Sequence, residues 1–202
     1  MNVPVRQQPP TTTQAAEGLP RRAWTVAEIE WMVEAGIIHE HERIELIGGE
    51  IVPMSAKGAF HETVKKDLNR FWAKRIPDDV DVIPETTFRT GERDFREPDF
   101  VFWPRALGVR GLKPHVVLLV VEVSDSSLDY DLGRKAAYYA SIGITDYWVI
   151  NARTLVTRLH RDPQGDQFQS VEDLPFDEHL VPLHLPALAV RLADLGLMPV
   201  VE

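Results

Sequence analysis

An acidic residue stands in the most apolar stretch of this chain. Glu122 lies within His115–Val123, a run that is otherwise almost entirely β-branched residues and leucine. An ionised carboxylate in such a buried strand suffers a large desolvation cost unless something compensates it. Glu122 is therefore either one half of a structural ion pair with Arg or Lys, or a functional acid.

A second acid strengthens the functional interpretation. Asp99 follows Pro98 and begins a short apolar strand that runs to Trp103. Neighbouring strands of a sheet can present their carboxylates to one point, and two converging carboxylates form an oxygen-rich site suited to Mg²⁺ or Mn²⁺. The alternative is that Asp99 is only a strand-start residue in a Pro-Asp turn.

Lys135 is the third candidate. It lies on a helix that follows the Glu122 strand and is expected to start at Asp131. An ammonium returning over the strand end could lower the pKa of a metal-bound water or stabilise charge developing on a phosphate. Taken alone, Lys135 is better explained as a helix-surface lysine.

The elements around these residues predict an α/β fold. The buried strand 115–123, a helix over 132–142 that stops at Gly143, and a second buried strand over 146–150 form a crossover unit with two parallel strands. A helix over 61–76 carries an apolar face at steps of three and four residues. Together they predict a central mixed sheet flanked by helices.

The chain outside this centre predicts smaller elements. Thr25 and Glu28 form a capping-box pattern for a helix over 26–35, and Gly48-Gly49 turns a hairpin between segments 43–47 and 50–52. Segments 155–160 and 168–171 predict a second hairpin, turned by residues 162–166, and the apolar segment 185–197 is expected to dock on the body.

Composition limits the remaining possibilities. The 202 residues include no cysteine, which excludes disulfides and thiolate chemistry. Residues 1–23 are rich in Pro, Thr and Gln and are interpreted as a disordered arm, and 24–202 as one domain. The longest apolar run, Val116 to Val121, is far below the roughly 20 residues of a membrane span, so we expect a cytoplasmic protein.

The charge of the chain is unusual for a protein that binds nucleic acid. The formal net charge is −9, whereas affinity for phosphate backbones normally comes from Lys and Arg. Basic residues still cluster in one predicted helix, at Lys65, Lys66, Arg70, Lys74 and Arg75. The alternative interpretation of that cluster is a solvated helix face.

Four ordered motifs resemble the bacterial Uma-two family, whose members are described as "putative restriction endonuclease". The motifs are Glu97-Pro98-Asp99, Val121–Ser127, Asp131-x-x-x-Lys135-x-x-x-Tyr139 and Gly143–Ile150, and the hairpin 43–52 agrees with them. The resemblance runs from roughly Trp24 to Leu197. It implies a PD-(D/E)XK restriction-endonuclease-like fold.

The resemblance also implies a site. Asp99 and Glu122 would be the metal-binding acids, joined by the backbone carbonyl of Val123. Ser124 stands where the wider superfamily has its lysine, and Lys135 would supply that charge from the following helix. Glu45 would be an outer acid that helps to hold a metal ion or water.

His61 occupies the place of a family histidine and would contact phosphate or carry a proton, although an ordinary helix-start histidine explains it as well.

Two functions from different classes are consistent with these observations. The first is a divalent-metal-dependent endonuclease acting on DNA, plausibly as a homodimer because cutting both strands favours two-fold symmetry. The second is a non-catalytic metal- or nucleic-acid-binding module that keeps the nuclease fold. The acidity of the chain favours the module, whereas the combination of Asp99, Glu122 and Lys135 favours the enzyme. RNA cannot be separated from DNA as a substrate by sequence.

Overall fold

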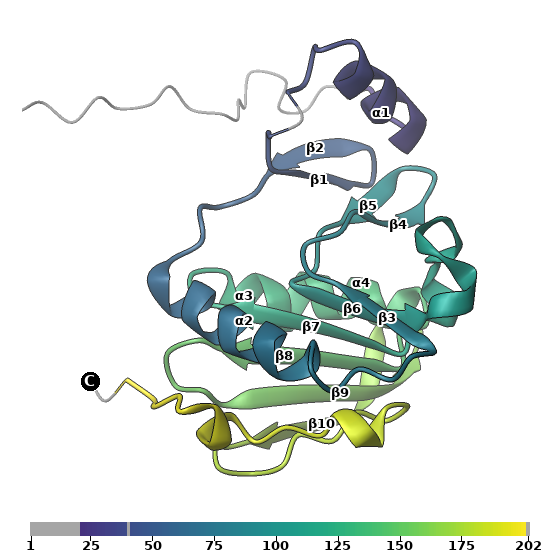
Figure 1. The fold of residues 1–202 in the computed structure, drawn as a ribbon. Helices are drawn as coiled ribbons and strands as arrows, with labels where there is room; N and C mark the ends of the chain where they lie inside the picture. The colour runs from purple at the N-terminus through teal and green to yellow at the C-terminus, as the bar shows by residue number, and fades with distance from the viewer. Residues whose placement is uncertain (1–20, 40, 201–202) are drawn as a thin grey trace, which may run out of the picture. The chain divides into compact units, whose positions relative to one another are not determined.

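The computed structural model describes residues 21–39 and 41–200 (Figure 1). They form two compact units, one that includes the chain up to Ser55 with Gly91–Asp94, and one that includes Ala56–Thr90 and the chain from Phe95 onwards. Most of the arm predicted for residues 1–23 lies outside the described residues, and the single domain over 24–202 stays a prediction.

The first unit contains the predicted helix and hairpin. Helix α1 (Val26–Glu34) begins with the capping box of Thr25 and Glu28, and strands β1 (Ile44–Ile47) and β2 (Glu50–Pro53) pair antiparallel. Gly49 at the turn has φ +84°, and a Cβ there would lie 2.7 Å from the Cβ of Ala23. Only glycine suits this position, because it combines a positive φ with close approach of the backbone.

The second unit is built on a six-stranded mixed sheet in the order β10-β9-β8-β7-β6-β3. Its central strands β7 (Leu119–Ser124) and β8 (Asp146–Asn151) are parallel, as the crossover pattern predicts, and the other pairs are antiparallel. The remaining strands of this sheet are β3 (Val80–Ile83), β6 (Phe100–Pro104), β9 (Thr157–Gln164) and β10 (Gln167–Leu174).

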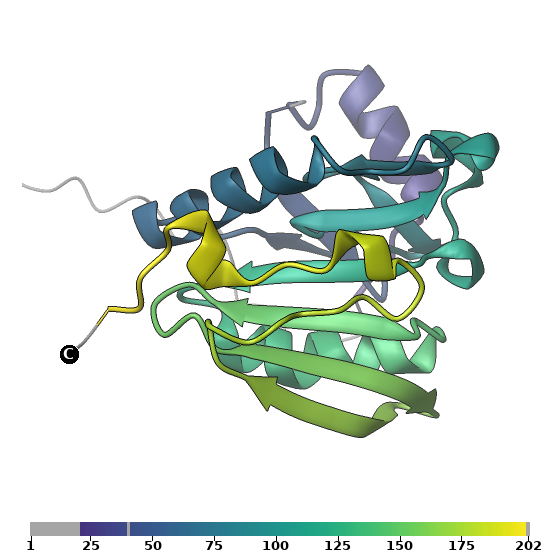
Figure 2. The ribbon, with the colours of Figure 1, turned by 60° about the horizontal axis from the view of Figure 1, so that its bottom comes forward.

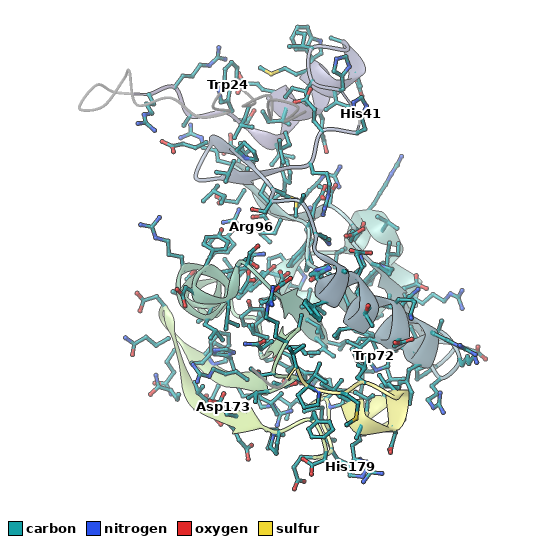
Figure 3. All side chains as sticks on the ribbon, turned by 90° about the vertical axis from the view of Figure 1, so that its left-hand side faces the viewer. Trp24, His41, Trp72, Arg96, Asp173 and His179 are labelled. Atoms are coloured by element: carbon teal, nitrogen blue, oxygen red, sulfur yellow. The ribbon has the colours of Figure 1, made fainter. Side chains whose placement is uncertain are left out.

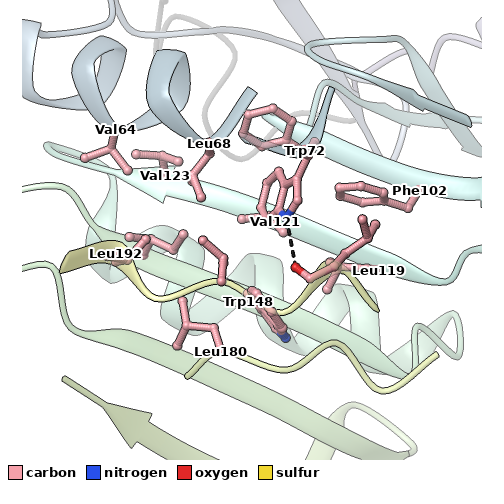
Figure 4. Packing of buried hydrophobic residues seen from close by; sticks show 14 of the residues in the cluster. Val64, Leu68, Trp72, Phe102, Leu119, Val121, Val123, Trp148, Leu180 and Leu192 are labelled. Atoms are coloured by element: carbon pink, nitrogen blue, oxygen red, sulfur yellow. Dashed lines mark hydrogen bonds between the residues drawn. The ribbon is translucent and has the colours of Figure 1, made fainter. Parts of the chain in front are cut away.

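Apolar side chains cover both faces of this sheet. Helix α2 (Ala59–Trp72) packs Val64, Leu68 and Trp72 on one face, against alternate residues of β6, β7 and β8. The segment after β10 lies beside α2 on that face (Figure 2), and Trp72 Nε1 donates a hydrogen bond to Leu188 O at 3.1 Å (Figure 4). This confirms the docking of the apolar tail.

The opposite face is covered by the helical segment between β7 and β8. It consists of α3 (Leu128–Tyr130), a π-helical turn η4 (Asp131–Lys135) and α4 (Ala136–Ser141). Ala136 and Tyr139 pack against Val120, Tyr147 and Val149 of the sheet. The two central strands are therefore buried on both faces, as their apolar sequences indicate.

Several predicted boundaries differ from the observed ones, among them the helix predicted over 61–76, which is observed as α2 over Ala59–Trp72. Strand β7 starts at Leu119 because Pro114 begins a 3-10 turn that takes up Pro114–Val116. The helix predicted to start at Asp131 already begins at Leu128. The second hairpin turns at Gly165 and Asp166, since β9 continues to Gln164 with Pro163 on the strand, and Asp173 lies on its outer strand β10 (Figure 3).

The short elements complete the description. They are the strands β4 (Phe88–Gly91) and β5 (Asp94–Arg96) and the 3-10 turns η1 (Arg105–Leu107), η2 (Val109–Gly111), η3 (Pro114–Val116), η5 (Pro186–Leu188) and η6 (Leu192–Leu195). Across the described residues, no helix has the length and apolar character needed to cross a membrane. The predicted fold class, a mixed sheet flanked by helices with an N-terminal helix and hairpin, is confirmed.

Candidate active site

The two predicted acids lie at the same end of the second unit's sheet, Asp99 directly before β6 and Glu122 on the neighbouring strand β7. Phe100 of β6 pairs with Val121 of β7 in antiparallel register, and continuing that register by one residue sets Asp99 opposite Glu122. Asp99 is 3% exposed and Glu122 is 4% exposed. The backbone N–H of Val123 donates to Asp99 Oδ2 at 2.8 Å, so Asp99 is attached directly to the strand that carries Glu122.

The Asp99 carboxylate accepts hydrogen bonds from two side chains as well as from the Val123 backbone. Lys57 Nζ lies 2.6 Å from Oδ1, and His61 Nε2 lies 2.9 Å from Oδ2. Burial alone would raise the pKa of Asp99, but the His61 hydrogen bond and the Lys57 charge outweigh it and lower the pKa to about 2. The carboxylate therefore stays ionised at neutral pH.

The start of α2 brings Lys57 and His61 to this point. Gly58 is the N-cap residue, and a Cβ on it would lie 2.6 Å from Asp125 Oδ2 in the loop after β7. Arg153 Nε holds the other oxygen of Asp125 at 2.7 Å. The absence of a side chain at residue 58 thus lets the first turn of α2 approach the end of β7 closely.

A closed ring of ionisable side chains extends from Asp99, and we call it the Asp99 cluster. His61 Nδ1 lies 3.1 Å from Glu62 Oε1, which accepts from Lys65 Nζ at 2.6 Å. Lys65 also donates to Glu85 at 2.9 Å, and Glu85 accepts from Lys57. The members, in order around the ring, are Asp99, His61, Glu62, Lys65, Glu85 and Lys57.

Glu85 has a backbone conformation that suits its place in this ring. Its φ is +55°, in the left-handed region that non-glycine residues rarely adopt, and its N–H donates to Pro98 O at 3.1 Å. That bond ties Glu85 to the residue preceding Asp99. Burial raises the pKa of Glu85, but the hydrogen bonds from Lys57 and Lys65 outweigh it and lower the pKa below its usual value.

Glu122 has different partners, and we call them the Glu122 cluster: Glu122, Asp131, Lys135 and Tyr139. Lys135 Nζ donates to Glu122 Oε1 at 3.0 Å, and Tyr139 OH lies 3.4 Å from the same oxygen. Lys135 is also 3.3 Å from Asp131 Oδ1. These three partners lie four residues apart along one helical segment, so they share one face of it.

Asp131 anchors that segment to β7. Its Oδ2 accepts hydrogen bonds at 2.6 Å from the hydroxyls of both Ser124 and Ser127. Tyr147 OH donates to the Asp131 carbonyl at 3.0 Å, and burial together with the charges of Asp131 and Glu122 raises the pKa of Tyr147 well above its usual value. Ser124, which stands at the expected lysine position, therefore orients the helix that carries Lys135.

The structure brings most of the predicted residues together. Asp99 contacts His61 and the backbone N–H of Val123, and Glu122 contacts Lys135. The role of the Val123 carbonyl as a metal ligand stays a prediction. Glu45 is buried on β1 in the first unit, and its role as an outer acid stays a sequence prediction. The basic helix cluster is not uniformly solvated, because the side chain of Lys65 is only 13% exposed and contacts two glutamates.

Six residues of the two clusters were not predicted as site residues: Lys57, Glu62, Lys65, Glu85, Asp131 and Tyr139. Lys57 and Glu85 lie in coil or turn segments whose residue types show no periodicity, so sequence gives little signal for them. Asp131 and Tyr139 did carry a signal, since they flank Lys135 at four-residue spacing. That spacing predicts a shared helix face.

Whether a divalent cation fits this site depends on which atoms could bind it. Two carboxylates and a backbone carbonyl are hard oxygen ligands of the kind that Mg²⁺ and Mn²⁺ prefer. Within residues 21–39 and 41–200, however, no three His, Cys, Asp or Glu side chains are arranged to hold a metal ion. Each Asp99 oxygen instead accepts from a nitrogen donor, so the chemistry of the pair fits a cation once a nitrogen donor gives way.

The comparisons with known proteins indicate a nuclease-like fold. The model of the Uma2 family, described as "Putative restriction endonuclease", matches residues 29–193, and the chain belongs to this family. This family membership and the nuclease-like fold support a nuclease.

A similar solved structure agrees in fold. A crystal structure of "a putative nuclease belonging to DUF820 from Anabaena variabilis" superposes with a TM-score of 0.60 and 16% sequence identity, covering 85% of this chain and 96% of that one. No curated protein matches this chain.

Proposed function

We propose that this protein is a divalent-metal-dependent endonuclease that hydrolyses phosphodiester bonds in DNA. The observation that carries the proposal is the position of two buried acids: by the register of β6 and β7, Asp99 and Glu122 lie opposite each other at one end of the sheet, with Lys135 beside Glu122. Buried charges of this kind are costly to maintain, which is more readily explained by chemistry than by stability.

The proposed mechanism assigns a task to each group. Asp99, Glu122 and the Val123 carbonyl would hold one Mg²⁺ or Mn²⁺. When bound, such an ion supplies Lewis-acid chemistry to a phosphodiester. Lys135 places a positive charge next to Glu122, where it can stabilise negative charge that develops on the phosphate. His61 orients Asp99 through its Nε2, and it would contact phosphate or carry a proton.

The helical segment after β7 has a positioning task. Tyr139 and Asp131 lie four residues on either side of Lys135, and both contact the same buried charge pair. Since the side chain of Lys135 is only 6% exposed, it has little freedom to leave Glu122. A fixed ammonium costs less reorganisation during the reaction than a mobile one.

The alternative function is a non-catalytic module, and one observation favours it. Both oxygens of Asp99 are already engaged by Lys57, His61 and the Val123 amide, an arrangement that is complete without a metal ion. The net charge of −9 agrees with this alternative. A cleavage assay separates the two functions.

The test is conversion of supercoiled plasmid to nicked or linear DNA with Mg²⁺ or Mn²⁺. We expect cleavage by the wild-type protein, none in EDTA, and a loss of at least about 10³-fold in Glu122→Gln, because the amide keeps the shape of the side chain but removes its charge. Asp173→Asn, on the outer strand β10, is a purification control that should cleave normally.

Other outcomes would change the assignment. Equal cleavage by the wild-type protein and Glu122→Gln would indicate a contaminating nuclease and remove the support for an enzyme centred on Glu122. Cleavage of RNA but not of DNA would keep the site and change the substrate. Light scattering of the purified protein tests the proposed homodimer, for which a doubled mass is expected.

A further inference from the structure

The Lys57–Asp99 contact has a consequence for cation binding. We propose that Lys57 is a built-in counter-ion of Asp99, which occupies the Oδ1 side of that carboxylate when no metal ion is bound and must move away for a divalent cation to bind. This inference rests on the proposed function, because it concerns the same acidic pair. It assigns a role to a residue that neither the resemblance nor the motifs single out.

The geometry of Asp99 determines which oxygen is involved. Oδ2 is fixed by two donors, the backbone N–H of Val123 at 2.8 Å and His61 Nε2 at 2.9 Å. Oδ1 accepts from Lys57 Nζ at 2.6 Å. A backbone amide within a strand cannot withdraw without breaking the sheet, whereas a lysine ammonium on a four-carbon stem can. Lys57 is therefore the donor that gives way.

The structure also provides a second partner for the displaced ammonium. Lys57 Nζ contacts Glu85 as well as Asp99. Glu85 is 35% exposed in its side chain and lies toward solvent, while the side chain of Asp99 is 4% exposed. Lys57 can therefore leave Asp99 and keep a carboxylate partner, which lowers the cost of the exchange.

The charges of the Asp99 cluster set the direction of the effect. Two lysines, Lys57 and Lys65, face three carboxylates, Asp99, Glu85 and Glu62. A divalent cation at Asp99 competes with the Lys57 charge for the same oxygen and is repelled by it. Removing that charge should strengthen cation binding, whereas a residue that merely helps to form the metal site would weaken it when removed.

The test is calorimetric titration of Mn²⁺ into the full-length protein without any nucleic acid. Lys57→Met should bind Mn²⁺ about 10-fold more tightly than the wild-type protein, because a repulsive charge a few ångströms away has been removed. Lys57→Arg keeps the charge and should bind no more tightly than the wild-type protein. Lys65→Met is the matched control, since Lys65 belongs to the same ring but has no contact with Asp99.

Melting temperatures provide a second test that can still be made if Lys57→Met is less stable than the wild-type protein. Without its counter-ion, buried Asp99 is destabilising, so the melting temperature in EDTA should fall below that of the wild-type protein, and Mn²⁺ should raise it by more than it does in the wild-type protein. Lys57→Gln, which retains a hydrogen-bond donor for Asp99, should change Mn²⁺ affinity in the same direction.

The outcomes separate this inference from the function on which it rests. Equal or weaker Mn²⁺ binding by both Lys57→Met and Lys57→Gln, with normal binding by the wild-type protein, would overturn the counter-ion role and leave the proposed metal site in place. Failure of the wild-type protein to bind Mn²⁺, or binding that Asp99→Asn leaves unchanged, would overturn both.

Discussion

The Asp99 cluster and the Glu122 cluster each compensate the charge of a buried carboxylate, and they do so in different ways. Asp99 contacts residues from separate segments, Lys57 before α2 and His61 on the first turn of α2, and it shares Lys57 with Glu85 after β3. Glu122 is neutralised by one helical segment that directly follows its own strand. The first cluster reaches solvent through Glu62 and Glu85, whereas every member of the second is buried.

This difference indicates a division of tasks between the two acids. A buried ion pair loses more stability when one partner is removed than a solvated pair does, because the remaining charge has no access to water. The Glu122 cluster should therefore behave as a rigid unit that keeps Lys135 in place. The Asp99 cluster, with a partly exposed ring and an alternative partner for Lys57, is better suited to exchanging cations.

The largest effect on stability is expected for Lys135→Met. We expect turnover to fall about 10²-fold or more, since a fixed positive charge near the phosphate is lost. Removing one partner of a buried pair should also lower the free energy of unfolding by about 3 kcal/mol. Plasmid cleavage rates and urea unfolding measure the two effects.

Lys65→Met in the Asp99 cluster sharpens the comparison. Its partners Glu62 and Glu85 are 50% and 35% exposed, so the loss of stability should stay below about 1 kcal/mol. If both lysine variants lost the same stability, the distinction between a rigid and an exchangeable cluster would be wrong.

Another prediction concerns the stability of the protein at low pH. The pKa of Asp99 lies at about 2 in the folded protein, below the ordinary 3.8, so ionised Asp99 stabilises the fold above pH 4 and this contribution disappears as the pH falls toward 2. It amounts to about 2 kcal/mol at neutral pH. Urea unfolding from pH 7 to pH 2 should show the wild-type protein losing its advantage over Asp99→Asn across that acidic range, and a constant difference would contradict the role of Lys57 and His61.

A smaller effect than that of Lys135→Met is expected for Ser124→Ala. The variant removes one of the two hydroxyl donors to Asp131 Oδ2 and should cost about 1 kcal/mol of unfolding free energy. Turnover should fall with it, because the helix that carries Lys135 is less firmly held. Ser127→Ala removes the other, partly solvated hydroxyl and should cost less, so a larger loss for Ser127→Ala would show that the Asp131 anchor is misassigned.

The difference between the two clusters also explains which site residues could be predicted from the sequence. Glu122, Asp131, Lys135 and Tyr139 lie within one strand and the helix after it, so residue spacing already predicts their common face. The Asp99 cluster depends on where a coil segment and a turn come to lie. Neither Lys57 nor Glu85 has a periodic neighbourhood, and only the folded chain brings them to Asp99.

Much of the fold could be predicted from local sequence patterns for a similar reason. The two-sided burial of β7 and β8 and the capping box of α1 are visible in consecutive residues. The π-helical turn at Asp131–Lys135 is not visible in the sequence, and in the structure its first residue, Asp131, accepts hydrogen bonds from Ser124 and Ser127. π-Helical turns are often found at functional sites, and here the turn carries Lys135.

The measurement that tests the central claim most directly is Mn²⁺ titration of the wild-type protein, Asp99→Asn, Glu122→Gln and the double variant. If the two acids hold one ion together, the wild-type protein binds one Mn²⁺ per chain, each single variant binds at least about 10-fold more weakly, and the double variant loses much less than the sum of the two. Single variants that bind Mn²⁺ as tightly as the wild-type protein would contradict the account, because Asp99 and Glu122 would then not form a shared metal site.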